Sequence, residues 1–289
     1  METAPNSGRK LFFGLFIFPL LIAVGMAVLL CGVVLLTSEQ ETPETLVAAI
    51  KSGAPGKRWQ KAFELSNEIN RSKDDLRSQA LRNELVHILG DSERYDAKTR
   101  SYMVLALAHF KDEESARALR RALKDPDGEV RLYALWSLGK LGAVDAVSEI
   151  VPFLSSEDPA FRQMGAYVLG AIGDKNMVSH LLPLLKEGVA DVRWNAALSL
   201  ARLGDASGVP ILLEMLDRRA LESSLGTTGK KVEEVMINAT KGLALIGNED
   251  SRKRLQVVAE RDESLKVRQA AMNAIRAQEI GRASCRERV

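Results

Sequence analysis

The sequence is poor in the residue types that most often carry chemistry. It contains two cysteines and three histidines among 289 residues, and only 5% of its residues are aromatic. Cys31 stands in a long apolar run, and Cys285 stands close to the end of the chain. The sequence between them therefore offers no disulfide, no thiol nucleophile and no cysteine-based zinc site.

The histidines also lack a metal-binding pattern. His87, His109 and His180 are widely separated, and none belongs to a zinc motif such as H-E-x-x-H. The segment Gly226–Lys230, GTTGK, has only two residues between its glycines, so it does not match a phosphate-binding loop. We therefore expect no catalytic, cofactor-binding or metal site, and we predict that the protein is not an enzyme.

A strong excess of charge is lacking too. Forty Lys and Arg residues against 38 Asp and Glu residues give a net charge of +2 at pH 7. Near-neutrality provides no general attraction to nucleic acid or to anionic lipid. Basic clusters at 117–124 and 252–254 suggest a nucleic-acid-binding alternative, but the sequence shows no array of aromatic residues for stacking bases. We predict no nucleic-acid partner.

What the sequence does contain is an internal repeat. Arg100, Arg131, Arg162 and Arg193 stand 31 residues apart, and we call their place the marker position. Small or apolar residues recur three, seven and ten places after the marker, and glycine recurs eleven places after it. The residues at offset three are Ala134, Gly165 and Ala196, and those at offset seven are Leu107, Leu138, Leu169 and Leu200. Offset ten holds Phe110, Leu141, Ile172 and Leu203, and offset eleven holds Gly142, Gly173 and Gly204. These offsets follow one face of an α-helix, and glycine suits the position after its end.

A second apolar group follows each marker segment, as at Val178, Leu181, Leu182 and Leu185. We call the first helix of each unit the marker helix and the second the companion helix. A hairpin of this size cannot bury its own apolar face, so neighbouring hairpins must stack. The repeat therefore predicts an all-α solenoid.

The repeat extends in both directions. Its phase returns at Met236 and Arg268 and, more weakly, at Arg58, while Pro43–Ser52 has the pattern of a lone companion helix. We expect about seven helical hairpins over residues 43–278.

Two irregularities interrupt the repeat. The step from Arg193 to Met236 is 43 residues, and its excess falls around Leu221–Lys231, where Ser, Thr and Gly predict a flexible, exposed loop that is either a binding element or a spacer. Pro152 and Pro183 occupy the same place in adjacent companion helices, where proline should bend the helix.

Acidic residues support the predicted helix starts. Asp96, Asp127 and Asp158 each stand four residues before a marker arginine, which suits an N-cap and an ion pair with that arginine, within the helix or across neighbouring repeats. Val189 occupies this place in the fourth unit, so we expect no such cap there.

The strings DGEVRLYALWSLGKLG (Asp127–Gly142) and ADVRWNAALSLARLGD (Ala190–Asp205) resemble HEAT-like repeats, in particular the short type first noted in phycobilisome linker-pigment lyases. The resemblance covers residues 43–278. It implies a right-handed α-solenoid whose second helices line the concave face. Because the family includes chromophore lyases, it also implies an alternative function as a chromophore-lyase-like enzyme or enzyme subunit.

Exposed positions of the companion helices are the predicted partner-binding residues. They run from a basic to an acidic end and could orient a partner of complementary charge. The alternative is a solvated surface of mixed charge. The residues are Arg117, Arg121, Lys124, Ser148, Ser155, Ser179, Lys186, Glu214 and Asp217.

An uncharged apolar run, Leu11–Leu36, stands near the N-terminus. As a helix it would span about 39 Å, enough to cross a hydrocarbon core of roughly 30 Å. Arg9 and Lys10 precede the run and acidic residues follow it, which predicts cytoplasmic residues 1–10 and repeats outside the cytoplasm, in the periplasm if the source is bacterial. A cleaved signal peptide is the alternative, but bulky apolar side chains continue to the end of the run, which favours an uncleaved signal anchor and a linker at 37–42.

Ala23, Ala27 and Cys31 stand four residues apart within this run. Such a stripe of small residues lets two membrane helices approach closely, so self-association through it is a hypothesis. The alternative is a chance stripe in an apolar sequence.

The C-terminal segment Glu279–Val289, EIGRASCRERV, differs from the repeats in composition. It resembles the translation of a common sequencing-library adapter. We expect these residues to be foreign and the natural protein to be truncated near Gln278, within the last hairpin of the solenoid.

These features predict a membrane-anchored scaffold that binds another protein on the concave face of a solenoid, without a cofactor. The identity of the protein partner does not follow from the sequence.

Overall fold

The computed structural model describes residues 13–37, 42–71, 78–226 and 229–286, and every regular element in these ranges is a helix. The chain divides into two compact units, Met1–Thr45 and Leu46–Val289. Residues 1–12 and 38–41, which include the predicted cytoplasmic segment and most of the predicted linker, lie outside the described residues.

The first unit contains the apolar helix. A π-helical turn, η1 (Phe13–Ile17), leads into α2 (Phe18–Thr37). Within it, Gly14–Val33 is long and apolar enough to cross a membrane, and its side chains are almost all exposed. Length and composition alone also fit a signal sequence. Ala23, Ala27 and Cys31 are exposed in α2, and self-association through them stays a prediction.

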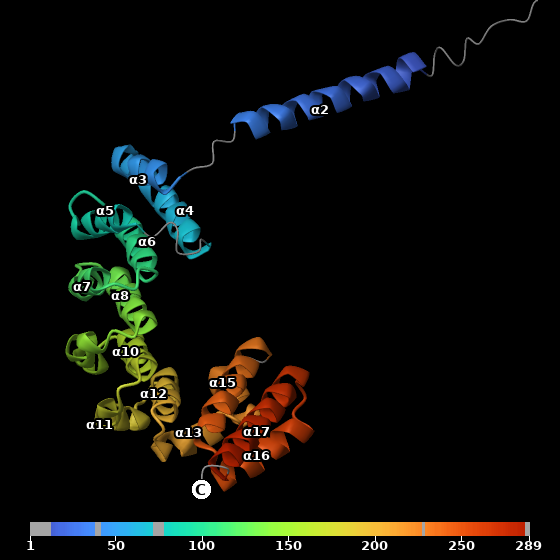
Figure 1. The fold of residues 1–289 in the computed structure, drawn as a ribbon. Coiled ribbons are helices and arrows are strands. Elements are labelled where there is room, and N and C mark those ends of the chain that lie inside the picture. The colour runs from blue at the N-terminus through green and yellow to red at the C-terminus, as the bar shows by residue number, and fades with distance from the viewer. Residues whose placement is uncertain (1–12, 38–41, 72–77, 227–228, 287–289) are drawn as a thin grey trace, which may run out of the picture. The chain divides into compact units, whose positions relative to one another are not determined.

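The second unit is a stack of helical hairpins, as predicted (Figure 1). It begins within α3 (Pro43–Ser52), the helix expected as a half repeat. The seven marker helices of the described chain are α4 (Arg58–Arg71), α6 (Ala97–Leu107), α8 (Gly128–Leu141), α10 (Pro159–Ile172), α12 (Ala190–Arg202), α15 (Lys230–Ile246) and α17 (Leu265–Arg286). The companion helices are α5 (Gln79–Gly90), α7 (Glu113–Ala122), α9 (Val147–Ile150) with η5 (Val151–Ser155), α11 (Val178–Leu181) with η7 (Leu182–Lys186), α13 (Val209–Glu214) and α16 (Glu249–Arg261).

Proline breaks two companion helices as expected. The α-helix α9 becomes the 3₁₀-helix η5 at Pro152, and α11 becomes η7 at Pro183. Proline lacks the N–H that would continue the α-helical hydrogen bonds, so the last turns tighten. The middle companion helices are therefore short and irregular, whereas their marker helices are regular.

The predicted N-caps are confirmed. Asp96 accepts a hydrogen bond from the Thr99 N–H, and Asp127 and Asp158 cap α8 and α10 in the same manner. Val189 precedes α12 without a side-chain cap, again as expected. Each aspartate uses its oxygens on the N–H groups of its own helix, and the arginine one turn later binds other partners.

The marker arginines join successive repeats. Arg131 donates from Nη1 to the carbonyl oxygens of Asp125 and Pro126, at 2.7 and 3.0 Å, so it binds the end of the preceding companion segment. Arg162, Arg193 and Arg268 make the same pair of bonds to the residues six and five places before them. The predicted pairing of Asp96, Asp127 and Asp158 with these arginines is therefore not what the structure shows.

Carboxylates extend this pattern from one repeat to the next. Arg100 forms a two-pronged pair with Asp125 at 2.7 and 3.0 Å, and both side chains are almost fully buried. Arg162 binds Glu187 at 2.8 Å. Since the Asp125 and Glu187 carbonyls accept from the next marker arginine, each of these residues links two repeats through its side chain and its backbone.

The insertion near Leu221–Lys231 is mostly helical, which corrects the expected flexible loop. Residues Arg218–Leu225 form α14, Leu221 is buried, and Lys230 begins α15; residues 227–228 lie outside the described residues. Arg218 binds the Asp262 carboxylate with two bonds at 2.7 and 3.2 Å. Asp262 stands six residues before Arg268, so the inserted helix supplies the arginine that Met236 lacks at the marker position.

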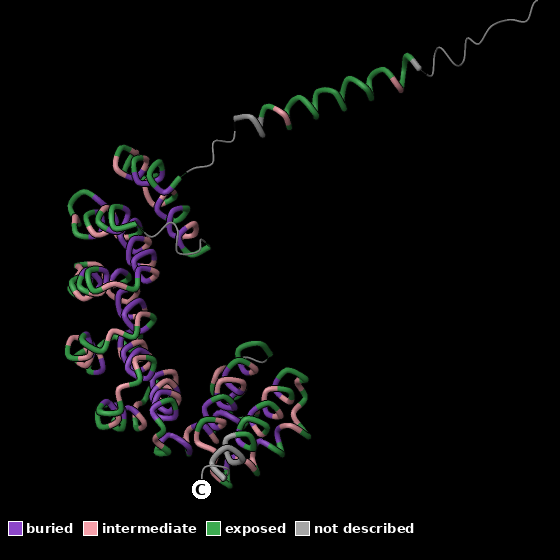
Figure 2. Tube along the Cα trace, in the orientation of Figure 1, coloured by how far each residue is buried: buried purple, intermediate pink, exposed green. Residues whose placement is uncertain are grey.

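Buried residues lie between the two rows of helices (Figure 2). One apolar cluster extends from Leu46 to Leu203, and a second extends from Trp194 to Ala274. Both contain residues of α12, so this helix takes part in both cores. The apolar periodicity therefore predicted most of the core: the residues three and seven places after the marker in α6, α8, α10 and α12 are buried, whereas Leu141 and Ile172 are only partly buried and Leu182 is exposed.

The marker helices, not the companion helices, form the inner row of the stack from α4 to α12 (Figure 1). The expectation that second helices line the concave face is therefore wrong. Small residues explain the difference, because they let marker helices approach closely. A Cβ atom added to Gly139 would lie 3.1 Å from a Val168 methyl, and one added to Gly170 would lie 2.7 Å from the Ser199 Cα.

The backbone of α17 continues through Arg286, and Glu279 and Ile280 are exposed. Residues 287–289 lie outside the described residues. The foreign origin of residues 279–289 stays a prediction.

We expect Arg100→Ala to destabilise the repeats by about 3–5 kcal/mol, because it leaves the buried Asp125 carboxylate without its cation. The measurement is chemical unfolding followed by circular dichroism. Arg117→Ala, which removes an exposed pair with Glu113, is the control and should change stability by less than about 1 kcal/mol. The double variant Arg100→Met/Asp125→Leu should lose less stability than Arg100→Ala; an equal or larger loss would contradict this account.

We also expect Gly170→Ala to destabilise, although alanine usually stabilises a helix by roughly 0.5–1 kcal/mol over glycine. The added methyl would meet the Ser199 backbone, and overpacking of this kind costs about 1–3 kcal/mol. Gly90→Ala, at the end of α5 with open space around it, is the matched control and should be neutral or stabilising. Equal effects of the two substitutions in thermal unfolding would rule out a close contact at Gly170.

Candidate binding surface

The nine residues predicted to bind a partner lie along the outer row. Arg117 and Arg121 are on α7, Lys124 follows it, and the others lie on or near the later companion helices: Ser148, Ser155, Ser179, Lys186, Glu214 and Asp217. All nine are exposed, as expected, but they do not converge on one place. Asp217 caps α14 by accepting from the Ala220 N–H, and Arg117 pairs with Glu113.

The basic cluster on α7 also has a structural use. Arg120 binds Glu149 of α9 at 2.6 Å, which ties two companion helices together. The hydrogen bond from Arg120 lowers the pKa of the Glu149 carboxyl, and the same bond raises the pKa of Arg120. At least one cation of this cluster is therefore engaged within the protein.

A more coherent surface lies on the marker helices. Positions two, five and nine after the marker share one helical face, and on α6, α8, α10 and α12 none of these residues is buried. Together with Trp59 and Phe63 of α4, we call these residues the inner face: Tyr102, Leu105, His109, Tyr133, Trp136, Lys140, Met164, Tyr167, Ala171, Asn195, Leu198 and Arg202.

Aromatic residues gather on the inner face. Of the three tryptophans and four tyrosines of the chain, five lie on this face, whereas Trp194 of α12 and Tyr95 are buried. Phe63 and Tyr102 pack edge to face across α4 and α6, with ring centroids 5.4 Å apart. Partial burial, and then the nearby Glu129 carboxylate, raise the pKa of Tyr133. The Glu129 carboxylate therefore lies beside the Tyr133 phenol.

Cations lie against several of these rings. The Lys98 Nζ is 3.4 Å from the centre of the Trp59 ring. Lys140 and Arg202 lie over Trp136 and Tyr167, at 5.2 and 5.0 Å. Such contacts combine an apolar platform with positive charge on the same surface. Lys140 also approaches the His109 Nε2 at 2.9 Å, which links α8 to the turn that follows α6.

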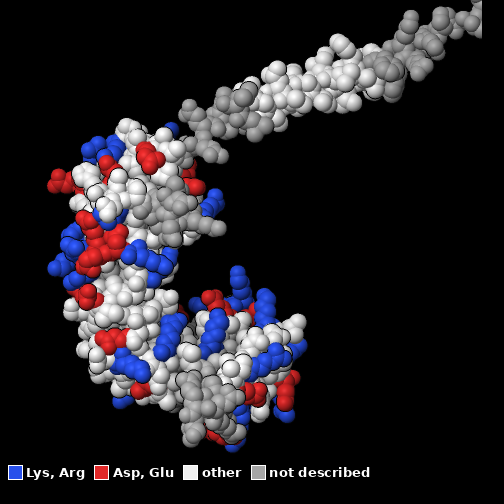
Figure 3. All heavy atoms as spheres, viewed as in Figure 1, with Lys and Arg blue, Asp and Glu red and all other residues white. Residues whose placement is uncertain are grey.

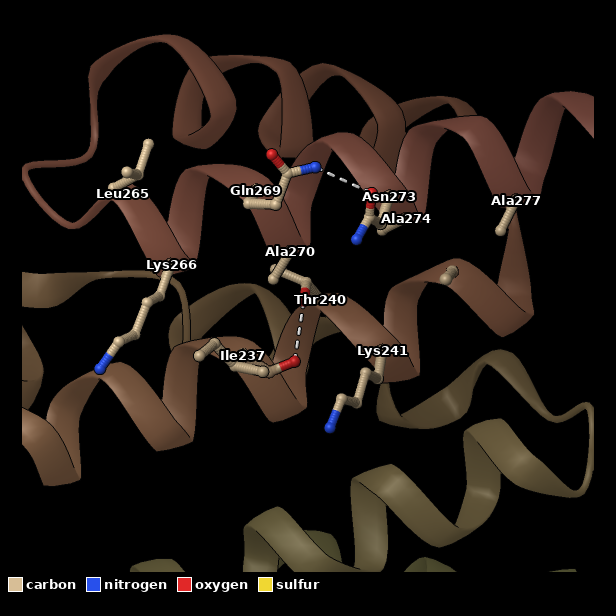
Figure 4. A pocket seen from close by; sticks show the side chains of 11 residues that line it. Ile237, Thr240, Lys241, Leu265, Lys266, Gln269, Ala270, Asn273, Ala274 and Ala277 are labelled. Atoms are coloured by element: carbon tan, nitrogen blue, oxygen red, sulfur yellow. Dashed lines mark hydrogen bonds between the residues drawn. The ribbon is translucent and has the colours of Figure 1, made fainter.

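A groove of about 770 Å³ lies between the marker helices α15 and α17 (Figure 4). Its walls are mostly apolar and include Ile237, Ala244, Leu265, Ala270, Ala274 and Ala277. Lys241 and Lys266 extend their side chains at its edge (Figure 4). None of the lining residues is aromatic, and at the positions that carry aromatic residues in the earlier repeats, two and five after the marker, the groove has Lys241, Ala270 and Asn273.

Charges of both signs are mixed over the visible surface of the repeats (Figure 3). This agrees with the near-neutral net charge of the chain. Among the described residues, no group of three or more His, Cys, Asp or Glu side chains is arranged to hold a metal ion. The surface chemistry that distinguishes the repeats is thus aromatic.

The inner face was not predicted, because binding was expected on the companion helices, and the expectation that the chain has no aromatic array was wrong. The signal was present in the repeat. Tyr102 and Tyr133 both stand two places after a marker, and Trp136 and Tyr167 both stand five places after one.

Comparisons with known proteins support the architecture. A family model described as HEAT repeats matches residues 83–153 and 147–223. No curated protein matches the sequence significantly.

Solved structures give the same result. The complex of CpcE and CpcF of phycocyanin lyase from Nostoc is 20% identical, with a TM-score of 0.53 over 84% of this chain and 96% of the matched chain. YibA of E. coli is 12% identical, with a TM-score of 0.54 over 84% of each chain. At these identities the similarity concerns the fold alone.

Proposed function

Because the chain is a HEAT-like repeat protein, we propose that it is an interaction scaffold whose inner face holds a protein partner. The observation that carries the proposal is the gathering of half-exposed aromatic residues on one row of helices. Trp and Tyr are enriched where proteins bind each other, since each offers a large rigid surface and a polar edge. No chemical step is part of this function.

Stacked repeats suit this role. The arginine links and the close contacts between marker helices fix the spacing of the inner face, so a partner meets a preformed surface. A preformed surface loses little conformational freedom on binding. The similar Nostoc structure is itself a complex of two proteins, CpcE and CpcF.

The alternative is a chromophore-lyase-like enzyme or enzyme subunit. The similarity to the phycocyanin lyase complex motivates it, although that similarity concerns the fold. A visible absorption band of a pigment that co-purifies with the protein would favour the lyase alternative. A colourless protein that retains its partner would favour the scaffold.

We further propose that Leu11–Leu36 anchors the protein in a membrane. The uncharged run, the preceding Arg9 and Lys10 and the acidic residues after it favour a cytoplasmic N-terminus and repeats on the other side. A signal peptide would be removed, whereas an anchor stays with the mature protein.

Cysteine labelling tests this topology. The native cysteines are first removed with Cys31→Ser and Cys285→Ser. In bacterial cells whose outer membrane has been permeabilised, we expect a membrane-impermeant maleimide to label Ser92→Cys. It should label Ser7→Cys only after the membrane has been dissolved. The reverse pattern would contradict the topology, and a mature protein whose mass lacks the apolar run would show a cleaved signal peptide.

Photo-crosslinking from within cells tests the binding surface. We expect a photoreactive phenylalanine at Trp136, on the inner face, to give a discrete crosslinked product with another protein. The same group at Arg121, on the outer row, is the matched control and should give none. Tyr133→Ala should weaken the product at position 136, because it removes a neighbouring aromatic contact. A product at position 121 alone would favour the outer row instead.

A further inference from the structure

We propose that the inner face from α4 to α10 binds an extended, proline-rich and acidic segment of its partner in the polyproline II conformation. The inference deepens the proposed function, on which it rests, by naming the chemistry of the bound segment. Three features of the surface lead to it: the spacing of the marker helices, the aromatic residues that they carry and the cations beside those residues.

Spacing comes first. Packed helices lie about 8–10 Å apart, and the contacts of Gly139 with Val168 and of Gly170 with Ser199 hold the marker helices at close approach. A polyproline II helix advances roughly 9 Å for each turn of three residues. Each turn of such a ligand therefore matches one repeat, and side chains three residues apart meet equivalent places. A β-strand returns to the same face every two residues, after roughly 6.6 Å, which does not match.

The aromatic residues supply the recognition. Each of the four marker helices carries at least one: Trp59 and Phe63 on α4, Tyr102 on α6, Tyr133 and Trp136 on α8, and Tyr167 on α10. Proline-rich segments dock in aromatic-lined grooves because their backbone is already extended and loses little entropy on binding.

Positive charge supplies the preference for acidic residues. Lys98, Lys140 and Arg202 each lie over an aromatic ring of this surface. In a ligand with an acidic residue at every third position, the carboxylates share one edge and meet these cations while prolines meet the rings. The aromatic pattern ends at α12, where Asn195 and Leu198 occupy positions two and five. The aromatic part of the inner face therefore suits a segment of about twelve residues, three for each of four repeats.

Single-stranded nucleic acid also binds surfaces that combine aromatic side chains with cations. The near-neutral charge of the chain favours a peptide, because a nucleic acid carries a negative charge on every nucleotide whereas the proposed segment carries one on every third residue. An oligonucleotide is therefore included as a competing ligand in the test.

The test is fluorescence anisotropy of labelled peptides with the full-length protein in detergent. We expect (Pro-Pro-Glu)4 to bind at least about tenfold more tightly than (Gly-Ser-Glu)4, which has the same charge without the stiff backbone, or (Pro-Pro-Lys)4, which has the opposite charge. Equal binding of the first two peptides would overturn the polyproline part, and equal binding of the two proline peptides would overturn the charge part. Tighter binding of a twelve-nucleotide oligothymidine, or no binding of (Pro-Pro-Glu)4, would overturn the inference as a whole.

Variants assign the effect to the surface. Trp136→Ala should weaken (Pro-Pro-Glu)4 binding by about tenfold or more, while Arg121→Ala on the outer row should leave it unchanged. Lys98→Glu/Lys140→Glu keeps the rings and should shift the preference towards (Pro-Pro-Lys)4, which a merely misfolded protein would not do. If the photo-crosslink at position 136 is present and no proline peptide binds, the scaffold function stands and this inference fails.

Discussion

A single arginine position organises the repeats. In Arg131, Arg162, Arg193 and Arg268 the guanidinium binds two carbonyl groups at the end of the preceding companion segment, and Arg100 binds one, that of Tyr95. Arg100 and Arg162 also bind a carboxylate at the end of the companion segment of their own repeat, Asp125 and Glu187 respectively. Carbonyl groups at the ends of helices have no partner within their helix, and a planar guanidinium with five donors can satisfy several of them together. Because every hairpin buries its apolar face against its neighbours, these links fix the register in which the hairpins stack. The inserted helix α14 illustrates how strong the constraint is, since it provides Arg218 where the marker position holds Met236.

Most of the fold could be predicted from the sequence. The 31-residue period predicted the marker helices, and the aspartates predicted where these helices begin. Pro152 and Pro183 predicted the breaks in the companion helices. Such features depend on local geometry, which acts within one or two turns of helix. The partners of the marker arginines could not be predicted in the same way, because Asp125 lies 25 residues from Arg100 and meets it only after the stack has formed.

The binding surface was harder to predict than the fold. Which row faces inwards depends on how closely adjacent helices approach, and this is decided by pairs such as Gly170 and Ser199 on different repeats. For a related reason, the sequence did not predict that α14 is a helix. Leu221 gives that short segment a buried contact and Arg218 gives it an ion pair, so tertiary contacts stabilise a helix in a stretch where Ser, Thr and Gly predicted a loop.

The two rows of the stack also differ in mechanical stiffness. Marker helices touch along close-packed glycine and serine positions, whereas the middle companion helices are interrupted by 3₁₀ turns at the prolines. When such a stack flexes, the tightly packed row acts as the neutral axis of a beam, and the looser row takes up most of the stretching and compression. The distances between neighbouring marker helices would then change little as the protein bends, so a ligand that spans several of them would stay bound.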